Sequence, residues 1–163
     1  MTVEEVFESA SLSSSGPVRW RDPVEESHKG VYIVARVGNI KANCEACSLP
    51  INCELINGLE IDRSYEMQRW IPGEPVLYVG QTIQPLRKRI GQFYHHTCGN
   101  RSPHAGGQVI LLVNCDLWLY WAPADVPKAA ETTMLEAFRQ QVGKLPFANF
   151  DGIRRPKRVR RAA

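Results

Sequence analysis

The sequence predicts a compact α/β or α+β sandwich, in which helices pack against a small mixed or antiparallel sheet. Short apolar runs rich in β-branched residues and bounded by glycine or turn residues predict the strands. The predicted strands lie at residues 30–37, 75–80, 108–113 and 117–122. Two segments with helical spacing of apolar residues predict the helices, one after Pro85 and one from Pro127 to Gly143. The chain has 163 residues and 44% hydrophobic content, enough for one core.

The chain divides by composition into a domain with two flanking segments. Residues 1–28 are acidic and Ser-rich, which predicts a flexible acidic leader with little packing of its own. Residues 29–153 form the expected domain, in which residues 39–73 lack a sustained period and are interpreted as an insertion between two strands. Residues 154–163 form a basic tail, which is either a solvated terminus or a contact to a nucleic-acid backbone.

Composition also bears on location and on metal chemistry. No apolar run approaches the roughly 18 residues that span a bilayer, so we expect a soluble, cytoplasmic protein with no membrane partner. Five cysteines, scattered and odd in number, suit a reducing compartment. Cys44, Cys47 and Cys53 are expected to be buried thiols; the alternative is a zinc site completed by His28 or Cys98.

The helix after Pro85 carries an arginine on its inward side. Its apolar stripe consists of Leu86, Ile90 and Phe93. Arg89 lies on this stripe, whereas Arg87 points about 100° away from Leu86. We therefore expect Arg89 beside the sheet, and Arg87 and Lys88 on an outer face.

The second helix carries a carboxylate on its inward side. Its apolar stripe consists of Met134, Leu135, Phe138 and Val142. Glu131 falls near the centre of that stripe and Glu136 on the opposite side. A carboxylate there costs stability unless it is paired or binds a metal, so Glu131 is the candidate ligand and Glu136 an exposed helix former.

Five short elements occur in a characteristic order. They are "GVY" at Gly30–Tyr32, "YVG" at Tyr78–Gly80, an arginine on the next helix, a glutamate on a later helix, and "PFAN" at Pro146–Asn149. In order and context this set resembles the GIY-YIG nuclease family, over roughly residues 29–150. The resemblance implies the GIY-YIG fold and hydrolysis of DNA phosphodiester bonds.

The resemblance also implies a role for each site residue. Tyr32 would be the general base or the group that positions the attacking water, with Tyr78 as its partner. Arg89 would brace the phosphate. Glu131 would hold one Mg²⁺ or Mn²⁺ per active site. Asn149 would orient the site or contact the phosphate; the alternative is a capping or turn role.

Other candidate contacts are less specific. Some members of the family have a histidine four residues after the arginine, where this chain has Phe93. His96 and His104 are therefore auxiliary candidates. Arg87 and Lys88 are candidates for contact with the DNA backbone.

The expected function is a Mg²⁺-dependent DNA endonuclease. The "SPHAGG" loop and the "LPFAN" segment look most like the restriction-enzyme-like branch of the family, with the 39–73 insertion a candidate for reading bases. One site cuts one strand, so cutting both requires a homodimer or two successive events. The alternatives are a structure-specific or repair nickase and a catalytically silent nucleic-acid-binding module.

Overall fold

The computed structural model describes residues 1–45, 55–56, 59–60, 67–95, 109–113 and 115–150. Within these residues, a four-stranded sheet has the order β1-β6-β2-β5, and each strand is antiparallel to its neighbours. The strands are β1 (Ser15–Arg19), β2 (Gly30–Ala35), β5 (Val76–Thr82) and β6 (Trp118–Pro123). A separate two-stranded sheet joins β3 (Leu55–Ile56) to β4 (Leu59–Glu60).

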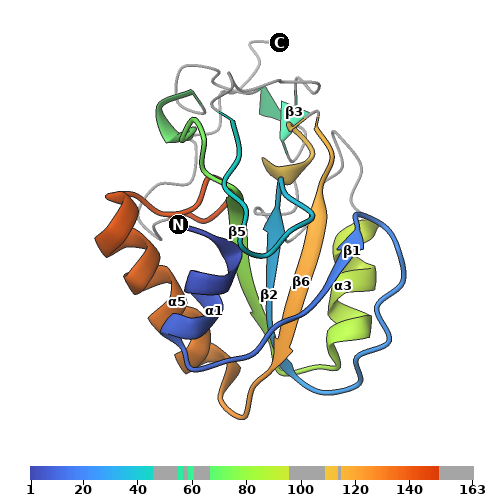
Figure 1. Cartoon of the computed structure of the whole chain (residues 1–163). Helices are drawn as coiled ribbons and strands as arrows, with labels where there is room; N and C mark the ends of the chain where they lie inside the picture. The colour runs from blue at the N-terminus through green and yellow to red at the C-terminus, as the bar shows by residue number, and fades with distance from the viewer. Residues whose placement is uncertain (46–54, 57–58, 61–66, 96–108, 114, 151–163) are drawn as a thin grey trace.

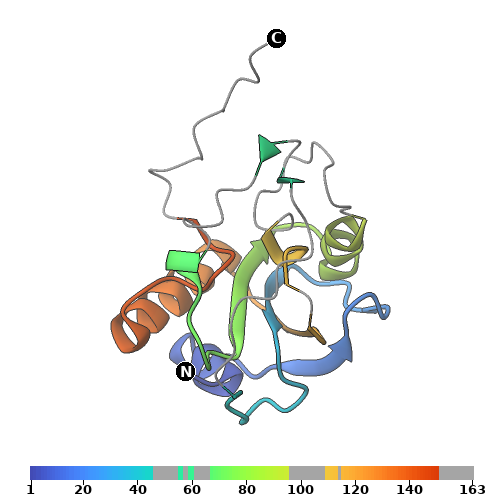
Figure 2. The same cartoon turned by 90° about the horizontal axis from the view of Figure 1, so that it is seen from above.

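Helices lie on both faces of the larger sheet (Figures 1 and 2). One face is covered by α1 (Val3–Ser9) and α5 (Pro127–Val142), and the other by α3 (Leu86–Tyr94). The predicted coarse class, an α+β sandwich with a small antiparallel sheet, is therefore confirmed. None of the helices in the described ranges is both long and apolar enough to cross a bilayer.

The central strand β2 explains why two cores form. All six of its residues are buried. Because side chains alternate along a strand, Val31 and Ile33 pack with α1 and α5, while Tyr32 and Val34 pack with α3. A β-carbon on Gly30 would lie 2.1 Å from the carbonyl oxygen of Ala122, so glycine at this position permits the close approach of β6.

The predicted helices form with the expected faces. Leu86, Ile90 and Phe93 of α3 are at most 2% exposed. Pro85 lies one position before the helix as its N-cap. The helix α5 ends at Gly143, which adopts a left-handed conformation with φ of 87°, a conformation in which glycine carries no steric penalty.

The expectation of a flexible leader over residues 1–28 is wrong. Val3, Val6 and Phe7 of α1 are at most 1% exposed, and β1 pairs with β6. Thr2 and Glu5 form a reciprocal capping box at the start of α1. Apolar side chains at i, i+3 and i+4 face one side of a helix, so this segment packs although its composition is acidic.

The expectation of a strand at residues 108–113 is also wrong for residues 109–112, which the structure describes. Val109–Leu112 forms a helical turn, in which the Leu112 amide donates to the carbonyl of Val109 at 3.1 Å. Val109, Ile110 and Leu112 are fully buried. A short apolar run buried on all sides carries no period that separates a strand from a helix. The fourth strand of the larger sheet is β1 instead of residues 108–113.

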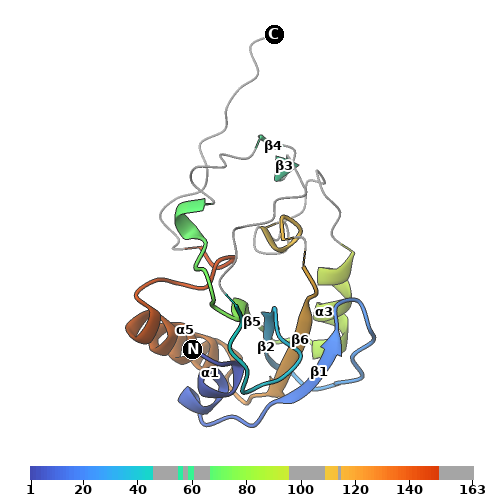
Figure 3. The ribbon, with the colours of Figure 1, turned by 45° about the horizontal axis from the view of Figure 1, so that its top comes forward.

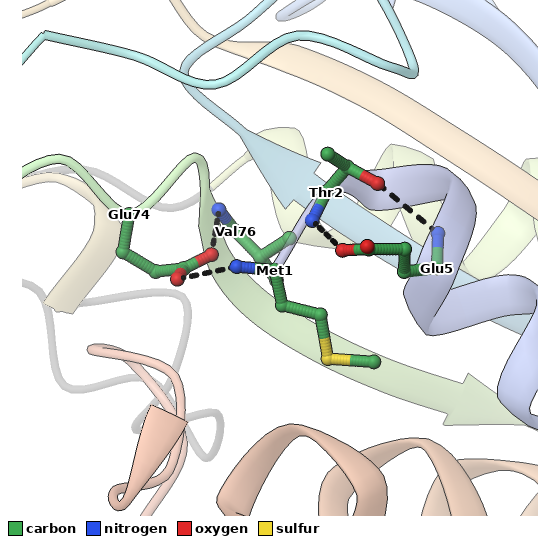
Figure 4. A network of polar contacts seen from close by, with 5 residues as sticks. All are labelled: Met1, Thr2, Glu5, Glu74 and Val76. Carbon is green, nitrogen blue, oxygen red and sulfur yellow. Dashed lines mark hydrogen bonds and ion pairs between the residues drawn. The ribbon is translucent and has the colours of Figure 1, made fainter. Parts of the chain in front are cut away.

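An ion pair joins the start of the chain to the segment before β5 (Figure 4). The Met1 ammonium lies 3.0 Å from Glu74 Oε2, with the two side chains 4% and 8% exposed. The other Glu74 oxygen accepts a hydrogen bond from the Val76 amide at 3.4 Å. Burial raises the pKa of Glu74, against the opposing effect of the ammonium. This carboxylate therefore links α1 to the beginning of β5.

Candidate active site

Two tyrosines lie side by side on the face of the sheet that α3 covers. Tyr32 on β2 is fully buried, and its ring lies 5.9 Å from the ring of Tyr78 on the adjacent strand β5. Phe93 of α3 stacks on Tyr78 at 5.4 Å and meets Tyr32 edge to face at 5.9 Å. Both tyrosines therefore leave the same face of neighbouring strands.

The glycine of the second motif creates the space for these rings. Gly80 pairs directly with Tyr32 across the two strands. A β-carbon on Gly80 would lie 2.6 Å from Tyr32 Cζ, 2.6 Å from Tyr78 Cε1 and 2.8 Å from the Tyr32 hydroxyl oxygen. These distances are far shorter than a van der Waals contact, so both phenols occupy the space a side chain would need.

The two phenols favour their neutral forms. Burial raises the pKa of Tyr32, and the positive charge of Arg89 opposes that rise. Burial, followed by the neighbouring Tyr32, holds the pKa of Tyr78 well above its ordinary value. The Tyr32 hydroxyl is buried, and its polar neighbours are the Arg89 guanidinium and the Tyr78 hydroxyl.

The arginine of the site comes from α3. Arg89 is half-buried, whereas Arg87 and Lys88 are exposed, as the helical spacing predicts. The Arg89 charge acts on both Tyr32 and Tyr78. A guanidinium beside two phenols can hold an anionic group such as a phosphate oxygen.

The first amides of α3 are already engaged by protein. The Leu86 amide donates to the His28 carbonyl and the Arg87 amide to the Glu26 carbonyl, both at 2.9 Å. These donors are therefore occupied and do not face a phosphate. Any recognition of an anion from α3 falls to its side chains.

The glutamate of the site comes from α5. The side chain of Glu131 is 13% exposed and lies 2.7 Å from the ammonium of Lys128, while Glu136 is exposed. The inward orientation predicted for Glu131 is thus confirmed. Its negative charge makes a minor contribution to the raised pKa of both Tyr32 and Tyr78.

The side chain of Asn149 forms hydrogen bonds with the backbone of β5. Its Nδ2 donates to the Val79 carbonyl at 2.7 Å, and its Oδ1 accepts from the Val79 amide at 2.9 Å. The Ala148 amide donates to the Leu77 carbonyl at 2.8 Å. Residues 146–150, the closing segment, thus extend along the outer edge of β5. Asn149 orients the strand between Tyr78 and Gly80.

The donor set fits one kind of metal site. Among the described residues, no group of three or more His, Cys, Asp or Glu side chains is arranged to hold a metal. A single carboxylate, Glu131, fits a magnesium ion that keeps most of its waters, and it does not fit an all-protein cage. The Lys128 ammonium contacts one oxygen of this carboxylate and would compete with a cation there.

Several candidate residues lie outside the described residues. These are His96 and His104, together with Cys47, Cys53 and Cys98. Cys44 is half-buried. His28 has an exposed side chain whose Nδ1 lies 2.6 Å from Glu26.

Sequence reasoning missed three residues that shape the site. Gly80 belongs to the second motif, and a glycine within a strand signals close packing of neighbouring groups. Lys128 lies three residues before Glu131, a spacing that places the two on one helix face. Arg69 hydrogen-bonds to the closing segment, and nothing in its local sequence pointed to that contact.

Comparisons with protein-family models, curated proteins and solved structures found no match.

Proposed function

We propose that this chain is a Mg²⁺-dependent DNA endonuclease with the GIY-YIG fold. The observation that carries the proposal is the pair of neighbouring tyrosine rings with the Arg89 guanidinium beside them. The rings of Tyr32 and Tyr78 lie 5.9 Å apart, and the charges of Arg89 and Glu131 both act on these phenols. A cation, a carboxylate that can bind a metal ion and two phenols are together able to support hydrolysis of a phosphodiester.

The tyrosines would act as neutral phenols. A raised pKa disfavours a phenolate at neutral pH, so Tyr32 is better suited to positioning the attacking water than to removing its proton outright. Its buried hydroxyl oxygen has lone pairs available to accept a hydrogen bond from that water. Tyr78 packs beside it and limits its movement.

Arg89 would bind the phosphate directly, and Glu131 would bind the metal ion. The Arg89 guanidinium would bind a non-bridging oxygen and stabilise the negative charge that develops in the transition state. Glu131 would hold Mg²⁺ or Mn²⁺, with Lys128 moving aside. The bound ion would supply Lewis acidity at the leaving oxygen.

The substrate and assembly follow from the same site. A single site of this kind cuts one strand, so we propose that a homodimer or two successive events cut a duplex. The exposed Arg87 and Lys88 would contact the phosphate backbone beside Arg89. The motifs favour a restriction-like role, for which the fragment ends of a digest would share one sequence.

Replacing the carboxylate tests the proposal. Glu131→Gln should reduce plasmid cleavage in Mg²⁺ by about 100-fold or more, the loss typical of one preorganised charged group. Binding of the same DNA in a gel-shift assay should be retained. Glu136→Gln, on the exposed side of the same helix, is the matched control and should cut like the wild type.

Two results would contradict the proposal. A wild-type protein that binds but never cuts DNA in Mg²⁺ or Mn²⁺ would indicate a binding module. Equal cleavage by Glu131→Gln and wild type would remove the carboxylate from the reaction.

A further inference from the structure

Arg69 joins the segment between the two motif strands to the closing segment of the chain. Its Nη2 donates to the carbonyl oxygens of Phe147 and Asn149, the latter at 2.9 Å. Its guanidinium lies 4.2 Å from the ring centroid of Phe150 and 5.7 Å from that of Phe147. One side chain therefore contacts three of the four residues at 147–150.

The closing segment in turn contacts the edge of the sheet. After α5 the chain turns back toward β5 (Figure 3). There the Ala148 amide donates to the Leu77 carbonyl, and the side-chain carboxamide of Asn149 forms two hydrogen bonds with the backbone of Val79. Val79 lies between Tyr78 and Gly80, so these hydrogen bonds hold the backbone next to the Tyr78 ring.

The contacts of Arg69 with two carbonyls and an aromatic ring suit an arginine and no other cationic side chain. A guanidinium is planar, always charged and carries several N–H donors in a fixed fork, so it can donate to two carbonyls while its face stacks on an aromatic ring. A lysine ammonium keeps the charge but has neither the fork nor the flat face. Trp70, next in sequence, packs edge to face on Phe147 at 5.2 Å and supports the same segment.

We propose that Arg69 is a positioning residue, which holds the closing segment against β5 and thereby sets the place of Tyr78 in the site. The catalytic part of this inference rests on the proposed nuclease function. Arg69 would act through Asn149 and the Val79 backbone, without contact to the phosphate. The segment between β2 and β5 would thus be coupled to the site through a side chain that neither motif contains.

Amide hydrogen exchange tests the structural part without any need for cleavage. In Arg69→Lys the Val79 amide, whose acceptor is Asn149 Oδ1, should exchange about tenfold faster or more, because its partner is no longer held. Amides of the β2–β6 ladder should exchange at the wild-type rate. Lys144→Ala is the matched control: it removes a hydrogen bond from Lys144 Nζ to the Gln68 carbonyl, 3.0 Å long and exposed, and should leave Val79 unchanged.

Cleavage kinetics test the catalytic part. Arg69→Lys should lower kcat about tenfold or more with KM within about twofold of wild type, because a small misplacement of a catalytic group costs rate without affecting substrate binding. Lys144→Ala should match the wild type in both constants.

The outcomes separate this inference from the proposed function. Unchanged exchange at Val79 in Arg69→Lys, or equal acceleration throughout the sheet, overturns the inference whether or not the protein cuts DNA. Faster exchange at Val79 with an unchanged kcat overturns the positioning role. If the wild type does not cut DNA, the proposed function fails, and the exchange pattern still decides whether Arg69 holds this edge.

Discussion

At the scale of single residues, the site depends on the absence of a side chain at Gly80. Tyr32 and Tyr78 approach each other over this glycine, and both rings occupy the place of its missing β-carbon. A larger residue must displace a ring or the strand, because interiors are close-packed. The short motif therefore encodes a packing requirement as well as a candidate catalytic group.

Gly80→Ala should destabilise the protein by about 1 to 3 kcal/mol, the usual cost of overpacking, and should lower cleavage through the displaced phenols. Gly91→Ala is the control within the neighbouring helix α3, because a β-carbon there meets nothing within 4 Å. Alanine in a helix interior should stabilise by up to about 1 kcal/mol. Urea denaturation measures both changes, and a Gly80→Ala protein as stable as the wild type would refute the packing argument.

At the scale of elements, the N-terminal helix and the closing segment complete a sheet that the central strands cannot cover alone. The helix α1 packs with α5 over one face. The closing segment covers the outer edge of β5 and pairs with its exposed backbone groups, which also protects an edge strand from other chains. Both pieces lie far in sequence from the motif strands.

Phe7→Ala should lower the free energy of unfolding by about 3 to 5 kcal/mol, as expected for a buried aromatic side chain; Phe7 is 1% exposed. Glu8→Ala, on the exposed side of the same helix, should change stability by no more than about 0.5 kcal/mol. Thermal and urea denaturation provide the comparison. A small effect of Phe7→Ala would mean that α1 does not contribute to the core in solution.

At the scale of the whole molecule, the ion pair between Met1 and Glu74 joins elements 73 positions apart. Burial raises the pKa of this carboxyl in the folded protein, whereas in the unfolded chain it has the ordinary glutamate value of about 4.3. The folded state therefore binds the proton more tightly. The resulting stabilisation is fully present below the unfolded pKa and is lost as pH rises through the folded pKa.

Relative to Glu74→Gln, the wild type should therefore lose stability as pH rises from about 4 to 7. Hydrogen bonds lower the pKa values of Glu5 and Glu26. These two carboxyl groups titrate in both proteins, so the comparison with Glu74→Gln cancels their contribution and isolates that of Glu74. Urea denaturation at several pH values measures the difference. A wild type that gains stability over the variant across this range would show that the ion pair outweighs burial.

Local patterns predicted much of the fold and most of the candidate site. Alternation and helical spacing are properties of neighbouring residues, so β2, β5, β6, α3 and α5 could be placed from the sequence. The same spacing predicted that Arg89 and Glu131 point inward. The signals for α1 are also local, in the Thr2–Glu5 capping box and the spacing of Val3, Val6 and Phe7, whereas the acidic composition of the segment favours a flexible leader.

The sequence by itself determined the central strands, the two long helices and the inward faces that carry Arg89 and Glu131, because each is encoded by the spacing of apolar residues within one element. Only the tertiary structure decided that Ser15–Arg19 is a strand, that Val109–Leu112 is a helical turn, and that Asn149 and Arg69 meet at the edge of β5. These features depend on backbone hydrogen bonds and charged contacts between distant segments. Such contacts leave no period in the local sequence, since their partners are chosen by how the chain packs.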